Sequence, residues 1–451
     1  MLFVTPEYAP LVKVGGLGDV SASLPAALRR LGIDVRVLLP GFPAVAAQLA
    51  RVPPLAALTL LGQRARLMEV TLARGVPLMA LDCPPLYQRS GGPYQDETGA
   101  DWKDNAMRFG VLSKAAAMLA SATSPLPWRP HVVHLNDWPS ALTAAYLHYL
   151  DGEHAYSVIT VHNLAFQGNF EPDTLEALQL PAKSYAPDGL EFHGSVSFLK
   201  AGLYYGDAIT TVSPTYAREI QTGPFGAGMH GLLQQRSQSL VGILNGIDIE
   251  EWNPASDPHL PVHYTDQTLT RKKGVKRALA ARLQLTAGHD DAPLIGFVGR
   301  LTQQKGVDLL LEAIPEILAL RARIAVLGAG ERHYERALRG LAAQHPGSVG
   351  VHIGFDETLA HLIEAGADMF LMPSRFEPCG LNQMYSQRYG TPPIAHATGG
   401  LVDTIVDCTS EKLQAGSATG FLFREPSTEA LTAAVRRALA LYCNTDSWCR
   451  L

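Results

Sequence analysis

Short apolar runs alternate with longer stretches of helical character along most of the chain. Residues 4–40 contain a strand, a glycine loop with a lysine, a helix and a second strand, which together predict one βαβ unit. A second alternation begins with the apolar run at 294–299 and continues with a helix from residue 307. Strands that alternate with helices predict parallel sheets with crossover helices. The pattern therefore indicates an α/β protein.

The same reading predicts the other elements by position. Strands are expected at 131–135, 157–161, 208–212, 241–244, 323–328, 349–354 and 368–372, and short apolar runs at 40–50 and 58–81 suit further strands. Helices are expected at 103–121, 141–150 and 197–205, from 213, from 331, and at 357–365, 381–389 and 429–442. A soft break is expected at 287–293.

The length of the chain favours two domains. It has 451 residues, of which 47% are hydrophobic, and this exceeds what one core usually supports. The junction is placed near 245–252, which divides the chain into domains 1–245 and 246–451. We therefore expect two doubly wound, Rossmann-like α/β domains that face each other across a cleft.

Charge and cysteine usage exclude several classes of protein. The net charge of −5 provides no broad basic field, which argues against nucleic acid or an anionic membrane as the main partner. The five cysteines form no C-x-x-C pair, so neither a disulfide framework nor a structural zinc site is indicated. The N-terminus lacks a signal-peptide pattern, and no apolar run is long enough to span a membrane. These features predict a cytoplasmic protein.

The loop after the first strand has the composition of an anion site. Gly15, Gly16 and Gly18 allow close approach of a ligand, and Lys13 lies beside them. Asp19 and Ser21 are predicted to cap the helix that follows. A purely structural turn is the alternative, since such loops are common. A nicotinamide site is not indicated, because the second strand does not end in the acidic residue that binds the ribose.

Polar residues follow several of the predicted strands, where ligands of open α/β sheets bind. His134, Asn136, Asp137 and Trp138 lie at the end of strand 131–135, and the sequence HNLAFQG (162–168) ends strand 157–161. These two clusters are expected at the same edge of the first sheet.

Two loops of the second half carry charged side chains at strand ends. Arg300 and Lys305 in GRLTQQKG suit a diphosphate whose charge must be neutralised as a leaving group departs, although a solvated charge pair is the alternative. SRFEPCGL (374–381) places Glu377 immediately before the expected helix N-terminus, where an ordinary capping role is the alternative to a catalytic one.

Five motifs together, K-x-GGLGD, HNLAFQG, GRLTQQKG, SRFEPCGL and TGGL at Thr398, resemble those of the bacterial glycogen synthases and plastid starch synthases. The resemblance runs from the first residues to about Tyr442 and implies a two-domain glycosyltransferase of the GT-B type. Such an enzyme transfers glucose from ADP-glucose to the non-reducing end of an α-1,4-glucan, such as glycogen, with retention at the anomeric carbon.

The resemblance also implies roles for individual residues. Those implied for catalysis are His162, Arg300, Lys305 and Glu377, of which Arg300 and Lys305 form the diphosphate clamp. Those implied for the donor are Lys13, Gly15, Gly16, Gly18, Asp19, Asn163, Asn245, Phe355, Cys379, Gly380 and Leu381, with Phe355 stacked on adenine. Tyr94, Asp137 and Trp138 are assigned to the acceptor, although buried aromatic packing is an equal alternative for Tyr94 and Trp138.

The implied chemistry needs no cofactor and no metal. Fixed cations can stabilise the departing diphosphate, and no D-x-D metal motif stands out. Asp137 and Glu377 are available carboxylates, but neither is assigned as a nucleophile, and a front-face displacement fits without one.

The chain departs from the family pattern at a few positions. Val14 replaces the usual Thr or Ser of the glycine loop, and Ala397 replaces a basic residue before TGGL. The family continues beyond the position of Leu451 with an F-S-W-like segment and a further helix, so the resemblance predicts that this chain lacks the final segment. Two alternatives stay open: a GT-B transferase that uses UDP-glucose, and a truncated, inactive glucan-binding protein. The sequence assigns neither an oligomeric state nor an acceptor chain length.

Overall fold

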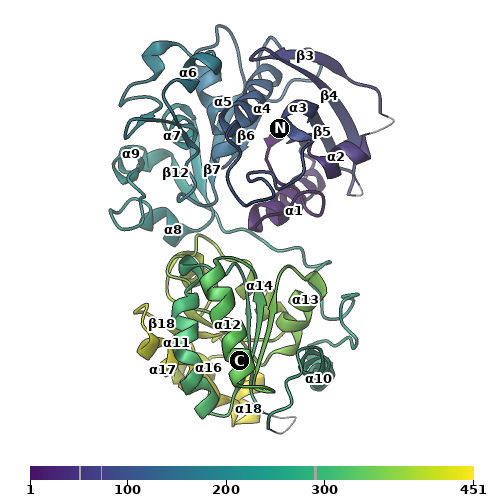
Figure 1. The fold of residues 1–451 in the computed structure, drawn as a ribbon, viewed down its shortest axis with the longest axis vertical. Coiled ribbons are helices and arrows are strands. Elements are labelled where there is room, and N and C mark those ends of the chain that lie inside the picture. The colour runs from purple at the N-terminus through teal and green to yellow at the C-terminus, as the bar shows by residue number, and fades with distance from the viewer. Residues whose placement is uncertain (50–51, 73, 289–291) are drawn as a thin grey trace. The chain divides into compact units, whose positions relative to one another are not determined.

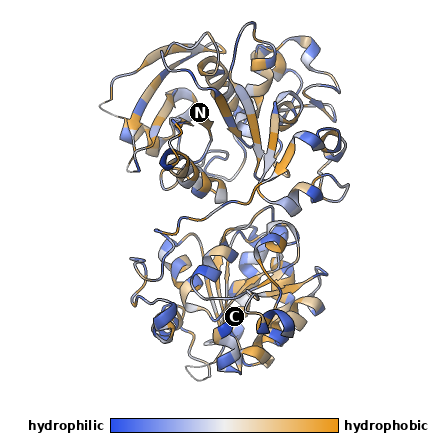
Figure 2. Cartoon of the chain, turned by 180° about the vertical axis from the view of Figure 1, so that it is seen from behind, coloured by the Kyte–Doolittle hydropathy of each residue, from blue (hydrophilic) through white to orange (hydrophobic). Residues whose placement is uncertain are grey.

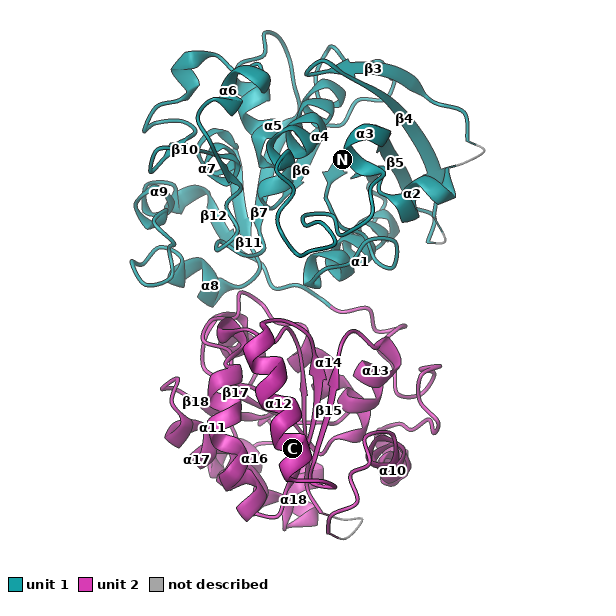
Figure 3. Ribbon diagram, in the orientation of Figure 1, with its two compact units in different colours: residues 1–246 teal, residues 247–451 magenta. Residues whose placement is uncertain are grey.

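The computed structural model describes residues 1–49, 52–72, 74–288 and 292–451 (Figure 1). Within these ranges the chain divides into two compact units, Met1–Gly246 and Ile247–Leu451 (Figure 3). The boundary expected after residue 245 lies one residue before this division. Part of the expected break at 287–293, residues 289–291, lies outside the described ranges.

A single large sheet forms the centre of the first unit. Among the described residues its nine strands lie in the order β12 (Leu240–Gly242), β11 (Ala208–Thr211), β7 (Tyr156–Val161), β6 (Val132–Asn136), β1 (Leu2–Val4), β2 (Arg36–Pro40), β5 (Pro77–Asp82), β4 (Gln63–Thr71) and β3 (Ala56–Leu60). The strands from β12 to β5 are parallel, whereas β4 and β3 are antiparallel. The central strand β1 is completely buried, as expected for a parallel strand covered on both faces.

Helices connect and cover these strands. They are α1 (Gly16–Arg30), α2 (Pro43–Gln48), α3 (Pro84–Tyr87), α4 (Asn105–Leu119), α5 (Trp138–His148), α6 (Thr174–Ala177), α7 (Phe198–Tyr205), α8 (Pro214–Glu219) and α9 (His230–Gln235). Short 3-10 turns occur at Ala182–Ser184 and Ser237–Ser239, and β8 (Asn169–Phe170), β10 (Ser195–Ser197) and β9 (Glu191–Phe192) form a small antiparallel sheet. Helices α4 and α5 are buried around most of their circumference, so they belong to the core.

One segment of the first unit differs from the predicted secondary structure. The apolar run at 40–50 was expected to contribute strands, but its residues 43–48 form helix α2; residue 50 lies outside the described ranges. Pro43 occupies the first position of this helix, where its missing N–H is not needed and its ring fixes a helical φ. A proline in an apolar run therefore favoured a helix start over a strand.

The second unit contains a fully parallel sheet. Among the described residues its six strands lie in the order β15 (Val349–Ile353), β14 (Arg323–Gly328), β13 (Leu294–Val298), β16 (Met369–Met372), β17 (Pro393–His396) and β18 (Phe421–Phe423). Its helices are α10 (Lys272–Arg282), α11 (Val307–Ala319), α12 (Arg332–Gln344), α13 (Glu357–Gly366), α14 (Asn382–Arg388), α15 (Gly399–Thr404), α16 (Ser410–Gln414), α17 (Thr428–Tyr442) and α18 (Thr445–Arg450). The described part of this unit also contains 3-10 turns at Asp266–Arg271 and Gln303–Lys305.

Apolar clusters cover both faces of this second sheet. Ile295 and Ile324 pack in one cluster with residues of α11 and α17, while their neighbours Leu294 and Ala325 pack in the other with residues of α10 and α13. This alternation follows from the opposite directions of successive side chains in a strand. Figure 2 shows the strands largely in hydrophobic colours and many outer helix faces in hydrophilic ones. Two Rossmann-like α/β units confirm the predicted fold class.

Candidate active site

The glycine loop joins strand β1 to helix α1. Gly15 has an extended backbone, and the helix begins at the next residue without a side-chain cap from Gly15 itself. Capping of this helix by Asp19 and Ser21 stays a prediction. Asp19 pairs with Lys13, whose Nζ lies 2.7 Å from its Oδ1. The hydroxyl of Ser21 lies 2.9 Å from that of Thr5, because both side chains turn into the protein interior.

A buried carboxylate that the sequence analysis missed holds this loop. Glu7 is 4% exposed. Its Oε2 accepts the N–H of Val14 at 2.8 Å and the N–H of Gly15 at 3.1 Å, and its Oε1 accepts the hydroxyl of Tyr94 at 2.7 Å. The Gly15 amide is thus bonded within the protein. The N–H of Gly18 donates to the Gly15 carbonyl at 3.1 Å, while the N–H groups of Gly16 and Leu17 have no acceptor in the helix itself. An acidic residue shortly after the first strand was the only sequence signal for this contact.

The polar residues at the ends of β6 and β7 lie together, as predicted. Asp137 bridges the two strand ends, because its Oδ1 accepts the N–H of His162 at 2.7 Å and that of Asn163 at 3.4 Å. The His162 ring contacts the neighbouring residue of β6, with Nε2 placed 3.0 Å from Oδ1 of Asn136. Asp137 has a φ of 56°, which is uncommon outside glycine and often marks functional sites.

Burial controls the charges of this cluster. Burial, with a smaller contribution from the neighbouring His134, lowers the pKa of His162 to about 3. Burial raises the pKa of Asp137 to about 7, although the two amides that it accepts oppose the rise and the charge of Glu7 adds to it. The imidazole of His162 is therefore neutral near pH 7, and Asp137 titrates there.

Tyr94 and Trp138 belong to one aromatic cluster. Their ring centroids are 6.2 Å apart, and both rings also contact Phe109. Trp138 further contacts Phe170 and Phe198. Aromatic packing explains these contacts without a ligand. Contact of Tyr94 or Trp138 with a glucan stays a prediction.

In the second unit the two charged loops meet. Nζ of Lys305 lies 2.6 Å from Oε2 of Glu377, and the hydroxyl of Ser374 donates to the same oxygen at 2.9 Å. Gly306 has a φ of 67°, and a Cβ there would lie 2.1 Å from the carbonyl oxygen of Pro373. Only glycine allows so close an approach, so this residue brings the loop after β13 against the loop after β16.

Glu377 differs from its predicted position. Helix α14 begins at Asn382, so Glu377 does not immediately precede it and does not cap it. Its backbone carbonyl instead accepts the N–H of Gly400 at 3.0 Å, at the start of α15. The TGGL motif thus packs against the backbone of Glu377, and a Cβ on Gly399 would lie 2.0 Å from the same carbonyl oxygen. The capping alternative for Glu377 is therefore wrong.

The remaining predicted site residues lie at separate places in the two units, outside the clusters described above. Arg300 is exposed at the end of β13, and its Nη2 lies 3.5 Å from Oε1 of Gln304. Phe355 is 79% exposed in the loop after β15. Asn245 lies half-buried between β12 and the end of the first unit. Cys379 and Leu381 are buried beside Gly380, which has a left-handed φ of 72°.

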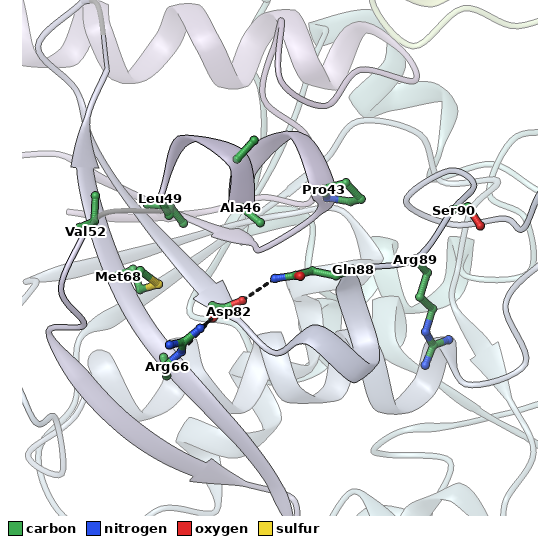
Figure 4. Close-up of a pocket in the computed structure, with 11 residues that line it drawn as sticks. Pro43, Ala46, Leu49, Val52, Arg66, Met68, Asp82, Gln88, Arg89 and Ser90 are labelled. Carbon is green, nitrogen blue, oxygen red and sulfur yellow. Dashed lines mark hydrogen bonds and ion pairs between the residues drawn. The ribbon is translucent and has the colours of Figure 1, made fainter.

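A surface pocket of the first unit lies apart from all of these residues. It measures about 730 Å³ and lies against α2 and the strands β4 and β5 (Figure 4). Its charged groups already bond within the protein: Arg66 donates to Asp82, and Arg89 donates to Asp104. The neutral amide of Gln88 also donates to Asp82. The pocket therefore contains none of the predicted site residues.

Two features are absent from the described ranges. No group of three or more His, Cys, Asp or Glu side chains there is arranged to hold a metal ion. No helix in the same ranges is both long enough and apolar enough to cross a membrane.

The two Rossmann-like units and their strand-end sites define a glycosyltransferase of the GT-B class. Residues 1–235 match the family model "Starch synthase catalytic domain", and residues 286–447 match "Glycosyl transferases group 1". The chain belongs to the family of bacterial glycogen synthases and starch synthases.

Similar proteins support this assignment over the full chain. The chain is 57% identical over 451 residues to a glycogen synthase of Aromatoleum aromaticum, with 99% of this chain and 91% of that protein covered. It is 54% identical over 460 residues to a glycogen synthase of Nitrosospira multiformis, covering 100% and 92%. The catalytic domain of starch synthase IV from Arabidopsis thaliana, solved with ADP and acarbose, matches with a TM-score of 0.89 and 33% identity, covering 100% and 93%.

Proposed function

We propose that this chain transfers glucose from ADP-glucose to the non-reducing end of an α-1,4-glucan, with retention at the anomeric carbon. The bond between the anomeric carbon and the phosphate oxygen breaks, a bond to the acceptor O4 forms, and ADP leaves. The departing phosphate takes the acceptor proton in a front-face displacement. The observation that carries the proposal is the joined Lys305, Glu377 and Ser374 cluster within a chain of this family.

On the second unit, cations act on the leaving group. Lys305 and Arg300 stabilise the diphosphate, which gains negative charge as the glycosidic bond breaks. Glu377 accepts sugar hydroxyls, and the backbone of Cys379, Gly380 and Leu381 continues that surface. The high exposure of Phe355 supports a role in stacking on adenine, because its ring is available to a ligand.

On the first unit, Lys13 and the glycine loop contact the donor, with Gly16 and Gly18 providing the close backbone approach. The Gly15 amide takes no part in this, since Glu7 already accepts it. Asp19, Asn163 and Asn245 contribute polar groups to the donor site. The acceptor glucan contacts the surface near Asp137, Tyr94 and Trp138.

His162 acts on the sugar without carrying charge. Nδ2 of Asn136 donates to the Val4 carbonyl at 3.0 Å, which orients Oδ1 toward the His162 ring. Nε2 of His162 must therefore carry the proton, and Nδ1 keeps its lone pair. A neutral ring of this kind can accept a hydroxyl of the transferred glucose, and its low pKa keeps it neutral during turnover.

We further propose that turnover needs no divalent metal, because the lysine and arginine side chains provide the positive charge. Full loss of activity in EDTA, with recovery on addition of magnesium or manganese, would contradict this part of the proposal.

The test of the function is ADP release from ADP-glucose in the presence of glycogen, compared with UDP release from UDP-glucose. We expect ADP release that requires glycogen and new chain ends that α-amylase digests. Equal or faster turnover of UDP-glucose would assign another donor. Binding of glycogen without ADP release would indicate an inactive glucan-binding protein.

A further inference from the structure

Hydrogen bonds that involve the residue after strand β1 and a residue of helix α1 fix the position of Glu7. Its N–H donates to the hydroxyl of Thr5 at 3.3 Å, and that hydroxyl donates to the Glu7 carbonyl at 2.9 Å. Thr5 also bonds Ser21 of helix α1 at 2.9 Å. Thr5 and Ser21 are fully buried. The backbone of Glu7 is thus attached to the end of β1 and, through Thr5, to the second turn of α1.

Three donors converge on this carboxylate. Two are the amides of Val14 and Gly15, and the third is the hydroxyl of Tyr94. Tyr94 is 87 residues away in sequence, so the contact fastens the glycine loop to a distant part of the same unit. A buried carboxylate that accepts several hydrogen bonds fixes their donors more firmly than a solvated one, since water does not compete for them.

The charge of Glu7 does not favour an anionic ligand. The carboxylates of Asp19 and Asp137 act on the same region, and Lys13 is the neighbouring cation. A carboxylate behind the loop repels a phosphate. The benefit of Glu7 for a phosphate-binding loop must therefore come from the geometry that it imposes.

We propose that Glu7 is a positioning residue for glucosyl transfer: by holding the amides of Val14 and Gly15, it presents Lys13 and the first amides of α1 to the donor. The inference rests on the donor role proposed above for the glycine loop. Lys13 directly precedes Val14, so any shift of the held amides moves the lysine as well. A displacement of about 1 Å in a group that positions the substrate can lower the rate by about 10²-fold, even when the mutated residue does not touch the reacting atoms.

Two variants of Glu7 distinguish the hydrogen-bond geometry that it imposes on the loop from the effect of its charge, and a third variant controls for general destabilisation. Glu7→Gln keeps the size of the side chain; its amide oxygen can accept the two loop amides, and its NH₂ can donate to the Tyr94 oxygen. Glu7→Ala removes all three contacts. Glu69→Ala is the control, because Glu69 is another glutamate of the first unit with a charged partner: on strand β4 it pairs with Arg36 of β2 and is partly buried.

The measurements are kcat and KM for ADP-glucose with glycogen, and amide hydrogen exchange of residues 13–18 in the full chain. We expect kcat/KM to fall about 10²-fold in Glu7→Ala, to recover to within about tenfold of the wild type in Glu7→Gln, and to stay unchanged in Glu69→Ala. Exchange at Val14 and Gly15 should accelerate in Glu7→Ala and stay slow in Glu7→Gln.

Two results would overturn the inference. One is normal kcat/KM in Glu7→Ala; the other is Glu7→Gln as impaired as Glu7→Ala while its loop amides remain protected, which would assign the effect to charge. The exchange experiment needs no turnover. If the wild-type chain released no ADP at all, the proposed function would fail, whereas loop amides that exchange as slowly in Glu7→Ala as in the wild type would separately refute the hold on the loop.

Discussion

Each unit pairs a lysine with a carboxylate near the end of a strand, but the two pairs differ in their surroundings. In the first unit Nζ of Lys13 lies 2.7 Å from Asp19, with side chains 28% and 17% exposed. In the second unit Nζ of Lys305 lies 2.6 Å from Glu377, with side chains 21% and 7% exposed. Ser374 donates a further hydrogen bond to the second carboxylate.

This difference indicates different tasks. A pair in a more exposed loop is screened by water and changes partners easily. A pair with a buried carboxylate acts in a lower dielectric, and its orientation is set before a ligand arrives. The second pair is therefore suited to stabilise charge that develops in a transition state, and the first is suited to contribute to binding.

The largest expected effect is that of Lys305→Ala. Removal of one preorganised group that stabilises developing charge should lower kcat by about 10²–10³-fold. The loss also leaves Glu377 buried without its cation, so the free energy of unfolding should fall. Steady-state kinetics and urea unfolding measure the two effects. The double variant Lys305→Ala/Glu377→Gln should regain stability but not kcat; recovery of both would show that the pair is structural.

Arg300→Ala should lower kcat by about 10²-fold, because Arg300 is assigned to the same diphosphate. Arg300→Lys should remain impaired, since a point charge does not reproduce the bidentate contact of a guanidinium. Both are measured as kcat with saturating ADP-glucose and glycogen. A normal kcat with only a raised KM would make Arg300 a simple binding residue, comparable to Lys13.

Phe355→Ala tests whether the second unit also contains a contact that binds the donor equally well in the ground state and in the transition state. Loss of stacking on adenine should weaken donor binding by about 1–3 kcal/mol, by analogy with bases stacked on aromatic side chains. KM for ADP-glucose and the Kd for ADP from calorimetry should rise together while kcat stays close to normal. An unchanged Kd would remove Phe355 from the donor site.

Asp137→Asn tests the buried carboxylate of Asp137 in the first unit, which accepts hydrogen bonds from backbone amides and has no lysine partner among the contacts described above. Its pKa is raised to about 7 from 3.8, so the folded protein binds the proton more tightly than the unfolded chain. The stability that the protonated group contributes is present below about pH 4 and is lost as pH rises to about 7. Relative to Asp137→Asn, the wild type should lose a few kcal/mol of unfolding free energy over this window. Urea unfolding of both proteins at several pH values measures this loss. If the unfolding free energies of the wild type and Asp137→Asn changed with pH in parallel, the assigned pKa would be contradicted.

Lys13→Ala should have the smallest effect. Because the pair with Asp19 is partly exposed, we expect KM for ADP-glucose to rise by up to about tenfold with little change in kcat, as for the loss of an interaction made equally in the ground and transition states. Asp19→Asn, which removes the partner charge, is the control. A fall in kcat as large as that of Lys305→Ala would abolish the distinction between the two pairs.

Local patterns were sufficient for most of the regular elements. The apolar runs at 294–299 and 323–328 became β13 and β14, and the amphipathic stretch at 429–442 became α17. Short elements were missed, among them β17 and β18, because strands of three or four residues carry too little periodicity to be recognised. The proline-led run at 43–48 was read as strand and is helix α2.

The sequence by itself determined the α/β class, the two-unit organisation and the residues that carry the family motifs, since these depend on local hydrophobic pattern and residue identity. Only the tertiary structure decided which charges meet. Lys305 and Glu377 are 72 residues apart, and Glu7 and Tyr94 are 87 apart. Asp19 pairs with Lys13, which precedes it by six residues across the glycine loop. A side chain bonds whichever partner the packed loops bring within reach, and that choice depends on chain paths that local sequence does not encode.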